Sequence, residues 1–341
     1  MRSALQLLAV LLAAGCVTGA SQHEKGGTRI EMGTGHFNRD GKPFHYWDRQ
    51  KEIPAVCARC HAAEGVPQYL REGKNTPAPH VKNGFACTNC HADMLTYERH
   101  KVAQVSFASG LTADSGDNNM NLCMTCHQGR ESTASVNKAI EGKDADTPDS
   151  KLAFIHVHYF PAGATVFGTQ ARVAYEYPGR SYAGRFNHVP GMDTCTSCHE
   201  PHAGELKTEK CGACHQGAKR GGESLAREVE SQKQVLHGAI QQYARSVGGR
   251  AIAFSPDAFP YWYTDANGNG KIDPEELRPD NSYKAYTPRL LQAIYNYTFL
   301  LRDPGAAYHN GRYARQLLHD SIESLAESGK AGVRPGGKAR P

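Results

Sequence analysis

Apolar residues recur at helical spacing in the last third of the chain, and this pattern predicts three helices. The first run stops at Gly248 and Gly249, and its apolar positions are Leu225, Val229, Leu236, Ile240, Tyr243 and Val247. The second opens with a capping Thr287 and a first-turn Pro288 and continues through Leu290, Leu291, Ile294, Tyr297 and Leu301. The third extends from about Ala306 to Ser328. We expect these helices to brace the rest of the chain on one side.

Upstream of residue 220 the hydrophobic pattern is irregular, with many Gly, Pro and polar positions. Residues 164–184, "ATVFGTQARVAYEYPGRSYAG", alternate apolar and polar positions and predict a short hairpin. Residues 131–151 are polar and predict a surface excursion. Residues 17–42 are Gly-rich and predict a linker, and residues 331–341 predict a disordered tail. The expected fold class is therefore mostly α with extensive irregular loops.

The N-terminal run "MRSALQLLAVLLAAGC", residues 1–16, has the form of a secretory signal. Arg2 precedes an apolar stretch that is too short to span a membrane. The final "AAGC" resembles the cleavage box of bacterial lipoproteins, which would make Cys16 the lipid-bearing first residue of the mature chain. The alternative is ordinary secretion with cleavage nearby. Both interpretations place the protein outside the cytoplasm.

Composition changes this picture mainly through its cysteines. The 341 residues include 11 cysteines and 17 histidines, and the formal charge is +5. No basic block or aromatic-basic interleaving is present, so nucleic acid is not an expected partner. Apart from Cys16, every cysteine belongs to a Cys-x-x-Cys-His motif, and the five motifs consist of Cys57, Cys60, His61, Cys87, Cys90, His91, Cys123, Cys126, His127, Cys195, Cys198, His199, Cys211, Cys214 and His215.

The spacing of this motif suits covalent haem attachment. Two thiols two residues apart can add to the two haem vinyl groups, and the following histidine then lies under the iron. Zinc sites pair two Cys-x-x-Cys knuckles but do not require a histidine after each one. Disulfides form in exported proteins, but their formation does not require a histidine after the second cysteine. Five complete motifs with no cysteine left over therefore favour haem.

With these motifs the chain resembles the multihaem c-type cytochromes of bacterial periplasmic and outer-membrane electron transfer. The resemblance implies five haems c with His61, His91, His127, His199 and His215 as proximal ligands. The motifs lie within an expected haem region, residues 43–220, which has too little polypeptide per haem to enclose each one separately. We expect stacked haems to form much of its core. Residues 221–330 form the expected C-terminal helical region.

Five irons need sixth ligands, and twelve histidines lie outside the motifs. His202 lies three residues after His199, so it should serve a different haem, and its "CHEPH" setting resembles haem-rich chains. His156 and His158 point to opposite sides of an extended segment, and we favour His158. His80 and His309 compete for one place. His23 and His36 belong to the expected tether, and solvated or interhelical positions are expected for His100, His237 and His319. The predicted sixth ligands are His45, His80, His158, His188, His202 and His309.

Residues 265–276, "DANGNGKIDPEE", match an EF-hand calcium loop. A glycine occupies position six and an apolar Ile272 occupies position eight. A plain Gly/Asn turn is the alternative. The predicted role of the ion is structural, and the predicted ligands are Asp265, Asn267, Asn269, the Lys271 carbonyl, Asp273 and Glu276.

These features predict an electron carrier of anaerobic or extracellular respiration rather than an enzyme. Expected partners are other cytochromes or a quinol-linked donor, and the lipid anchor would attach the chain to the membrane in the periplasm or at the outer membrane. One alternative is a multihaem reductase of a nitrogen or sulfur oxyanion, which needs an iron with an open site. Another is a subunit of a haem filament or conduit.

Overall fold

The computed structural model describes residue 36 and residues 46–82, 84–215, 222–329 and 339–341. The expected signal, the lipid-bearing Cys16 and all of the expected linker except residue 36 lie outside these residues, as do His23 and His45. The helices of the described chain are α1 (Ala55–His61), α2 (Gly65–Glu72), α3 (Asn118–Met124), α4 (Thr133–Ile140), α5 (Ala162–Phe167), α6 (Cys195–Cys198), α7 (Glu209–Gly212), α8 (Glu223–Ser246), α9 (Pro288–Arg302) and α10 (Ala306–Glu327). Short 3-10 helices span His80–Lys82, Cys87–Asn89, Gly168–Gln170 and Pro279–Asn281.

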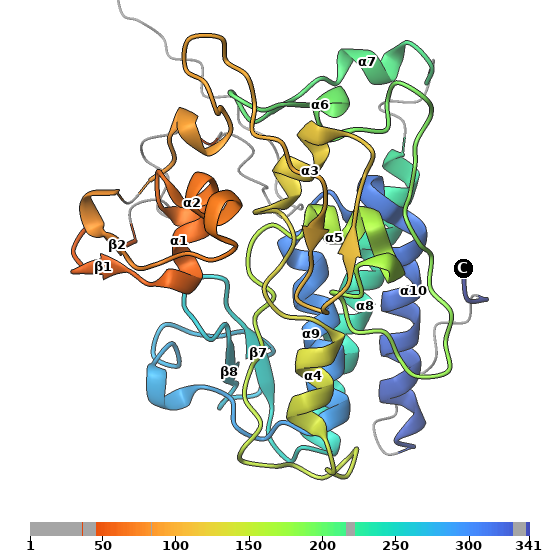
Figure 1. Ribbon diagram of the computed structural model, residues 1–341. Coiled ribbons are helices and arrows are strands. Elements are labelled where there is room, and N and C mark those ends of the chain that lie inside the picture. The colour runs from red at the N-terminus through yellow and green to blue at the C-terminus, as the bar shows by residue number, and fades with distance from the viewer. Residues whose placement is uncertain (1–35, 37–45, 83, 216–221, 330–338) are drawn as a thin grey trace, which may run out of the picture. The chain divides into compact units, whose positions relative to one another are not determined.

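The described strands form four separate antiparallel pairs (Figure 1). They are β1 (Glu52–Ile53) with β2 (Ala78–Pro79), β3 (Val105–Ser106) with β4 (Thr112–Ala113), β5 (His199–Glu200) with β6 (Glu205–Leu206), and β7 (Ile252–Phe254) with β8 (Trp262–Thr264). Each strand has two or three residues, so these pairs fix loops rather than build a sheet. The predicted mostly helical, loop-rich fold is confirmed.

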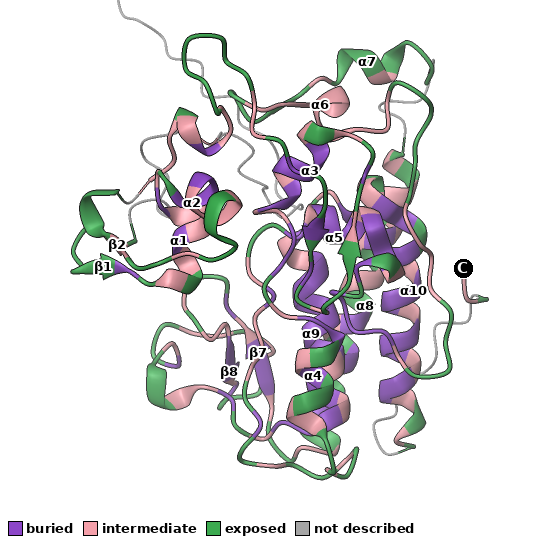
Figure 2. Cartoon of the chain, viewed as in Figure 1, coloured by how far each residue is buried: buried purple, intermediate pink, exposed green. Residues whose placement is uncertain are grey.

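The three helices predicted from hydrophobic spacing are present as α8, α9 and α10, and Figure 1 shows them packed together. Thr287 caps α9 as expected, because its side chain accepts a hydrogen bond from the Leu290 N–H at 3.1 Å. Eleven of the 15 residues of α9 are buried, the largest share among the three helices (Figure 2). Helix α8 buries one face and exposes the other, and α10 is buried along more than half of its length.

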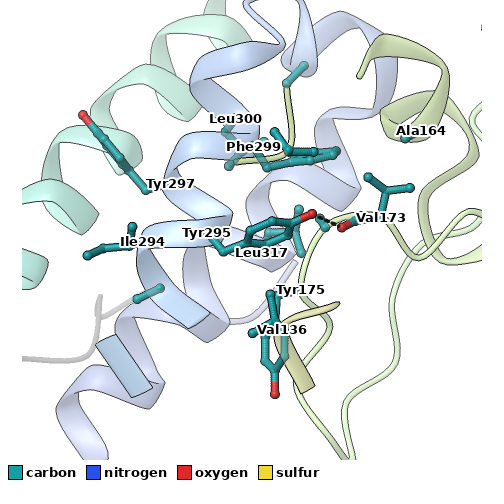
Figure 3. Packing of buried hydrophobic residues seen from close by; sticks show 14 of the residues in the cluster. Val136, Ala164, Val173, Tyr175, Ile294, Tyr295, Tyr297, Phe299, Leu300 and Leu317 are labelled. Carbon is teal, nitrogen blue, oxygen red and sulfur yellow. Dashed lines mark hydrogen bonds between the residues drawn. The ribbon is translucent and has the colours of Figure 1, made fainter. Parts of the chain in front are cut away.

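One hydrophobic core joins these helices to the motif-bearing part of the chain. The cluster extends from Val66 to Leu325. Figure 3 shows Tyr295 of α9 reaching the segment after the third motif, where its hydroxyl donates to the Val173 carbonyl at 2.9 Å. Asn296 holds Tyr175 on both sides, accepting from its N–H at 2.8 Å and donating to its carbonyl at 2.9 Å. The C-terminal helices therefore help to position the motif region.

The predicted hairpin at residues 164–184 is wrong. This segment contains α5 and a 3-10 helix, and its remainder is extended without strand pairing. Tyr295 and Asn296 of α9 supply the hydrogen bonds that a second strand would have supplied. The apolar alternation there reflects packing against a helix.

The polar segment 131–151 is fastened more firmly than a surface excursion suggests. It contains α4, in which Val136 is fully buried. Its Asp146 carboxylate accepts from Arg289 Nε at 2.7 Å, which ties the segment to the start of α9.

Near the C-terminus, Arg340 donates to Asp320 of α10 at 2.8 Å. No helix in the described part of the chain combines the length and apolar character needed to cross a membrane.

Removing the α9 cap should destabilise the whole helical group. Thr287→Ala deletes the fully buried hydroxyl that accepts from Leu290 N–H and lies 3.0 Å from the Tyr243 hydroxyl. We expect the free energy of unfolding to fall by about 1 to 2 kcal/mol. Thr287→Ser keeps the capping oxygen and should lose less than half of that amount. Thermal unfolding of both variants measures the difference, and equal losses would contradict a capping role.

Candidate functional site

Each Cys-x-x-Cys-His motif forms a single helical turn. In the second, third and fifth motifs, the histidine N–H donates to the carbonyl of the first cysteine at 2.9 to 3.0 Å. The fourth motif makes the same bond at the end of α6, and the first motif lies within α1. Residues three and four apart share one face of a helix, so this turn presents both thiols and the imidazole on the same side. The ten described cysteines all carry free thiols.

Each motif histidine faces a second imidazole from a distant segment. The ring centres of four pairs lie 5.9 Å apart for His61 and His158, 6.3 Å for His91 and His202, 6.0 Å for His127 and His36, and 6.3 Å for His199 and His309. For His215 and His188 the separation is 6.1 Å. The ring planes of two pairs are nearly parallel, with interplanar angles of 1° for His91 and His202 and 7° for His215 and His188. No second imidazole is used twice.

This separation fits one metal ion between two rings. A metal–imidazole nitrogen bond is about 2 Å long and the ring centre lies roughly 1.1 Å behind the nitrogen, so two rings on one metal have centres about 6 Å apart. All five observed separations fall close to this value. The thiols of each motif turn lie on the same side as its imidazole. The residues present therefore fit a haem c held between two histidines.

The outer nitrogens of several rings are held by hydrogen bonds. Nδ1 of His91 meets the Tyr97 carbonyl at 2.7 Å, and Nδ1 of His127 meets the Phe160 carbonyl at 3.2 Å. The remaining described Nδ1 bonds are His36 to the Pro201 carbonyl at 3.2 Å, His202 to Glu200 Oε1 at 3.3 Å, and His309 to both oxygens of Asp303 at 2.8 and 2.9 Å. All five rings make these bonds through Nδ1, so Nε2 is the nitrogen that would be used to hold a metal.

Burial keeps several of these imidazoles neutral, the form that binds metals. Burial lowers the pKa of His127 to about 4 and, with help from Arg130, lowers the pKa of His158 to about 4. It also lowers the pKa of His36 and of His199. His309 differs, because the Asp303 carboxylate outweighs burial and raises its pKa.

The second imidazoles come from loops and a helix start. His158 has a positive φ of 76° in an irregular segment, and His202 lies in the turn between β5 and β6. His309 lies in the first turns of α10, just before Asn310 interrupts the helical geometry. His202 therefore pairs with His91 of the second motif. It does not pair with His199, in agreement with the expectation that two histidines only three residues apart belong to different sites.

The structure brings four of the six predicted sixth ligands to a motif histidine: His158, His188, His202 and His309. His45 lies outside the described residues. His80 is exposed, and no described ring of a motif histidine contacts it. Sequence reasoning missed His36, which it had assigned to the tether, although this residue pairs with His127 and stacks on Phe85 at 4.7 Å. No local signal marked it beyond its being a histidine.

The other histidines have structural partners. His156 Nε2 accepts from Arg302 Nε at 3.2 Å, and its ring lies 5.8 Å from that of His158. His100 bonds the Thr88 carbonyl at 2.8 Å, and His237 stacks on Tyr297 at 5.3 Å. His319 contacts Asp320. These contacts give each of the four rings a partner within the protein.

A cavity of about 580 Å³ lies beside His158. Arg130, Lys138, Glu131 and His156 line it together with the apolar Phe154, Ile155 and Phe259. Two cations next to apolar walls suit a flat apolar group that carries carboxylates, whereas Glu131 supplies the opposite charge. The cavity adjoins one member of the first pair, His158.

The EF-hand-like loop follows β8 and folds around two buried acids. Asp265 and Glu276 are 2% and 6% exposed. Asp265 accepts from the Asn269 and Gly270 N–H groups at 3.1 and 2.8 Å, and Glu276 accepts from the Ala266 N–H at 2.7 Å. The side chains of Asn267 and Asn269 both meet Asp273 Oδ2, at 2.7 and 2.9 Å. Predicted ligand side chains thus converge, and Gln241 of α8 holds the loop through the Gly270 carbonyl at 2.8 Å.

Comparison with known proteins gives relatives that cover most of the chain. C-type polyheme cytochrome OmcB of Geobacter sulfurreducens is 28% identical over 82% of this chain, and C-type polyheme cytochrome OmcC of the same species is also 28% identical over 82%. The chain spans less than half of these relatives, 45% and 44% of their lengths. No family model and no solved structure matches. The relatives confirm the resemblance to multihaem c-type cytochromes that the motifs predicted.

The third motif should be sensitive to a single added methyl group at α5. A Cβ at Gly163 would lie 2.6 Å from Met124 Cγ and 2.8 Å from the His127 carbonyl. We expect Gly163→Ala to lower the free energy of unfolding by about 1 to 3 kcal/mol through overpacking. Gly212→Ala, inside the fifth motif, meets nothing within 4 Å and serves as the matched control. Thermal unfolding compares them, and an unchanged Gly163→Ala would show that α5 is not packed on the motif as described.

Proposed function

We propose that this relative of the polyhaem c-type cytochromes carries five covalently attached haems c, each between two histidines, and transfers electrons one at a time. The observation that carries the proposal is the set of five facing imidazole pairs beside five Cys-x-x-Cys-His turns. Two thiols of each turn would form the thioethers. When bound, haem supplies a one-electron Fe(III)/Fe(II) couple.

The roles of the residues follow from the pairs. The motif histidines His61, His91, His127, His199 and His215 are the proximal ligands. The opposite ligands, in the same order, are His158, His202, His36, His309 and His188. Two imidazoles on each iron would keep it low-spin and leave no position for a substrate, which suits electron transfer and not bond-making chemistry.

The motifs also lie close enough together to form a relay. Cys126 of the third motif lies beside Cys60 of the first, and Cys123 lies beside Cys195 of the fourth. Helix α3, which ends within the third motif and carries Cys123, packs against α6, which carries both cysteines of the fourth. Cys198 of the fourth motif interacts with Cys211 of the fifth. We infer that the third motif lies between the first and the fourth motifs in space and connects them in the relay.

The two alternative functions have less support. A reductase needs one iron with an open position, whereas every motif histidine of the described chain faces a second imidazole. A filament subunit that borrows a histidine from its neighbour would leave one internal pair incomplete, and no pair is incomplete among the described residues. We propose redox proteins as partners and export to the periplasm or outer membrane, with Cys16 as the lipid anchor.

Spectra of the holoprotein test the ligand assignment. We expect low-spin bands only, with no change on adding carbon monoxide or cyanide. Each single replacement by alanine of His36, His158, His188, His202 or His309 should convert about one fifth of the haem to a high-spin, ligand-accepting form, because one iron of five loses a ligand. His80→Ala is the matched control and should leave the spectrum unchanged. A wild-type protein that already binds carbon monoxide would contradict the proposal.

We further propose that residues 265–276 bind one structural Ca²⁺. The buried Asp265 and Glu276 carboxylates and the converging Asn267, Asn269 and Asp273 side chains support this site. Hydrogen bonds from Asn281 to the Thr264 and Glu276 carbonyls, both at 2.8 Å, close the loop on its outer side. The role is to stiffen the connection between β8 and the segment before α9.

Metal analysis tests the calcium site. The double variant Asp265→Ala, Glu276→Ala should lose the one bound Ca²⁺ per chain and unfold at a lower temperature, because two of the ion's charged ligands are gone. Glu275→Ala removes an exposed carboxylate at a position that is not a ligand and should keep the ion. Equal calcium content in wild type and the double variant would reject the site.

A further inference from the structure

Asp303 and His309 form a buried ion-pair-like contact at the junction of α9 and α10. Asp303 is the first residue after α9, and His309 lies in the beginning of α10. Both carboxylate oxygens face the same ring nitrogen, with Nδ1 at 2.8 Å from Oδ1 and 2.9 Å from Oδ2. We propose that Asp303 positions His309 and lowers the reduction potential of the iron held by His199 and His309. This inference rests on the proposed function.

The geometry fixes which nitrogen of His309 is left for iron. A carboxylate accepts hydrogen bonds and cannot donate them, so Nδ1 must carry the hydrogen. Nε2 then keeps its lone pair, and the ring lies 6.3 Å from the ring of His199. A carboxylate bonded to the outer nitrogen of a metal-binding histidine fixes its orientation and makes it a stronger electron donor.

The surroundings hold this contact rigidly. The Asp303 side chain is 2% exposed, and the Gly305 N–H donates to its Oδ1 at 3.2 Å. Gly305 also leaves room for the ring, because a Cβ there would lie 2.6 Å from His309 Cε1. The carboxylate and the imidazole therefore cannot easily move apart. Solvent does not screen the charge as it would at the surface.

The sign of the effect follows from charge. Reduction of Fe(III) to Fe(II) adds one electron and breaks no bond, so the ferric state carries one more positive charge. A fixed anion beside the ring stabilises the ferric state more than the ferrous state. The stronger donor character of the ring acts in the same direction. Asp303 thus makes this iron harder to reduce.

The other Nδ1 contacts provide an internal comparison. His36, His91 and His127 meet neutral backbone carbonyls. His202 meets the Glu200 carboxylate at 3.3 Å, but these side chains are 64% and 40% exposed. Among the imidazoles that pair with a motif histidine or belong to a motif, and for which a Nδ1 contact is described, the contact of His309 with Asp303 is the one that combines a negative charge with burial.

A redox titration of the holoprotein tests the inference. Asp303→Asn keeps an oxygen that can accept from Nδ1 but removes the charge. We expect all five haems to stay low-spin, and one redox transition to move upward by at least tenfold in its equilibrium constant, which is 59 mV for a one-electron couple. That transition must belong to the haem that becomes high-spin in His309→Ala. Glu200→Gln is the matched control, with an expected change below twofold because the charge is screened by water.

The outcomes separate this inference from the function on which it rests. Low-spin haems with unchanged potentials in Asp303→Asn would overturn the role of Asp303 and leave the proposed function standing. A wild-type spectrum without five low-spin haems would overturn the proposed function itself. If Asp303→Asn does not accumulate, near-infrared magnetic circular dichroism of the wild type decides. One ferric charge-transfer band should be displaced to shorter wavelength from the other four, and five coincident bands would overturn the inference.

Discussion

The structure depends on one constraint, which is that two imidazoles must meet about 6 Å apart beside each cysteine motif. The motif turn supplies the first ring through local hydrogen bonds alone. The second ring must come from elsewhere, and for most pairs it comes from far along the chain. Long irregular segments follow from this requirement, because a loop can deliver a side chain to a place that no regular element passes.

The C-terminal helices help to position these imidazoles in a different way. Their core packing is regular and would be stable for ordinary reasons, with α9 buried on nearly every side. Polar side chains on α9 then hold the backbone of residues 173–175, and α10 begins where His309 is needed. Arg289 reaches back to Asp146 and fastens the intervening loop. A conventional helical group therefore organises a region that contains little regular structure of its own.

Much of the fold and part of the candidate site could be predicted from the sequence. The motifs and the three long helices depend on short-range spacing, so the sequence predicted them directly. The expectation that His156 and His158 point to opposite sides of an extended segment was wrong, because His158 has a positive φ and the two rings lie 5.8 Å apart. The choice of His158 over His156 nevertheless agrees with the fold, since the ring of His158 faces His61 and His156 accepts from Arg302. The hairpin at residues 164–184 failed because the hydrogen-bond partners of that segment are side chains of a remote helix, which periodicity does not reveal.

The second imidazoles show where sequence reasoning ends. The sequence singled out His202 from its local setting, but its facing ring, His91, could be identified only from the fold. His36 was missed, although its ring lies 6.0 Å from that of His127, because a histidine in a Gly-rich stretch has no local feature that distinguishes it from other residues of a tether. His80 had a more promising setting, yet it lies exposed in a short 3-10 helix. Pairing is a property of three-dimensional proximity between distant segments.

The position of His309 near the end of the chain has a consequence for biogenesis. Under the proposed function, a polypeptide exported N-terminus first would present its five motifs well before α10 crosses the membrane. The fourth motif would then wait for its second ring until almost the whole chain had emerged. A chain that ended before α10 would lack the ring that faces His199 and would expose that iron to small ligands and oxygen. Emergence of α10 would therefore be the step that closes the last open iron during maturation.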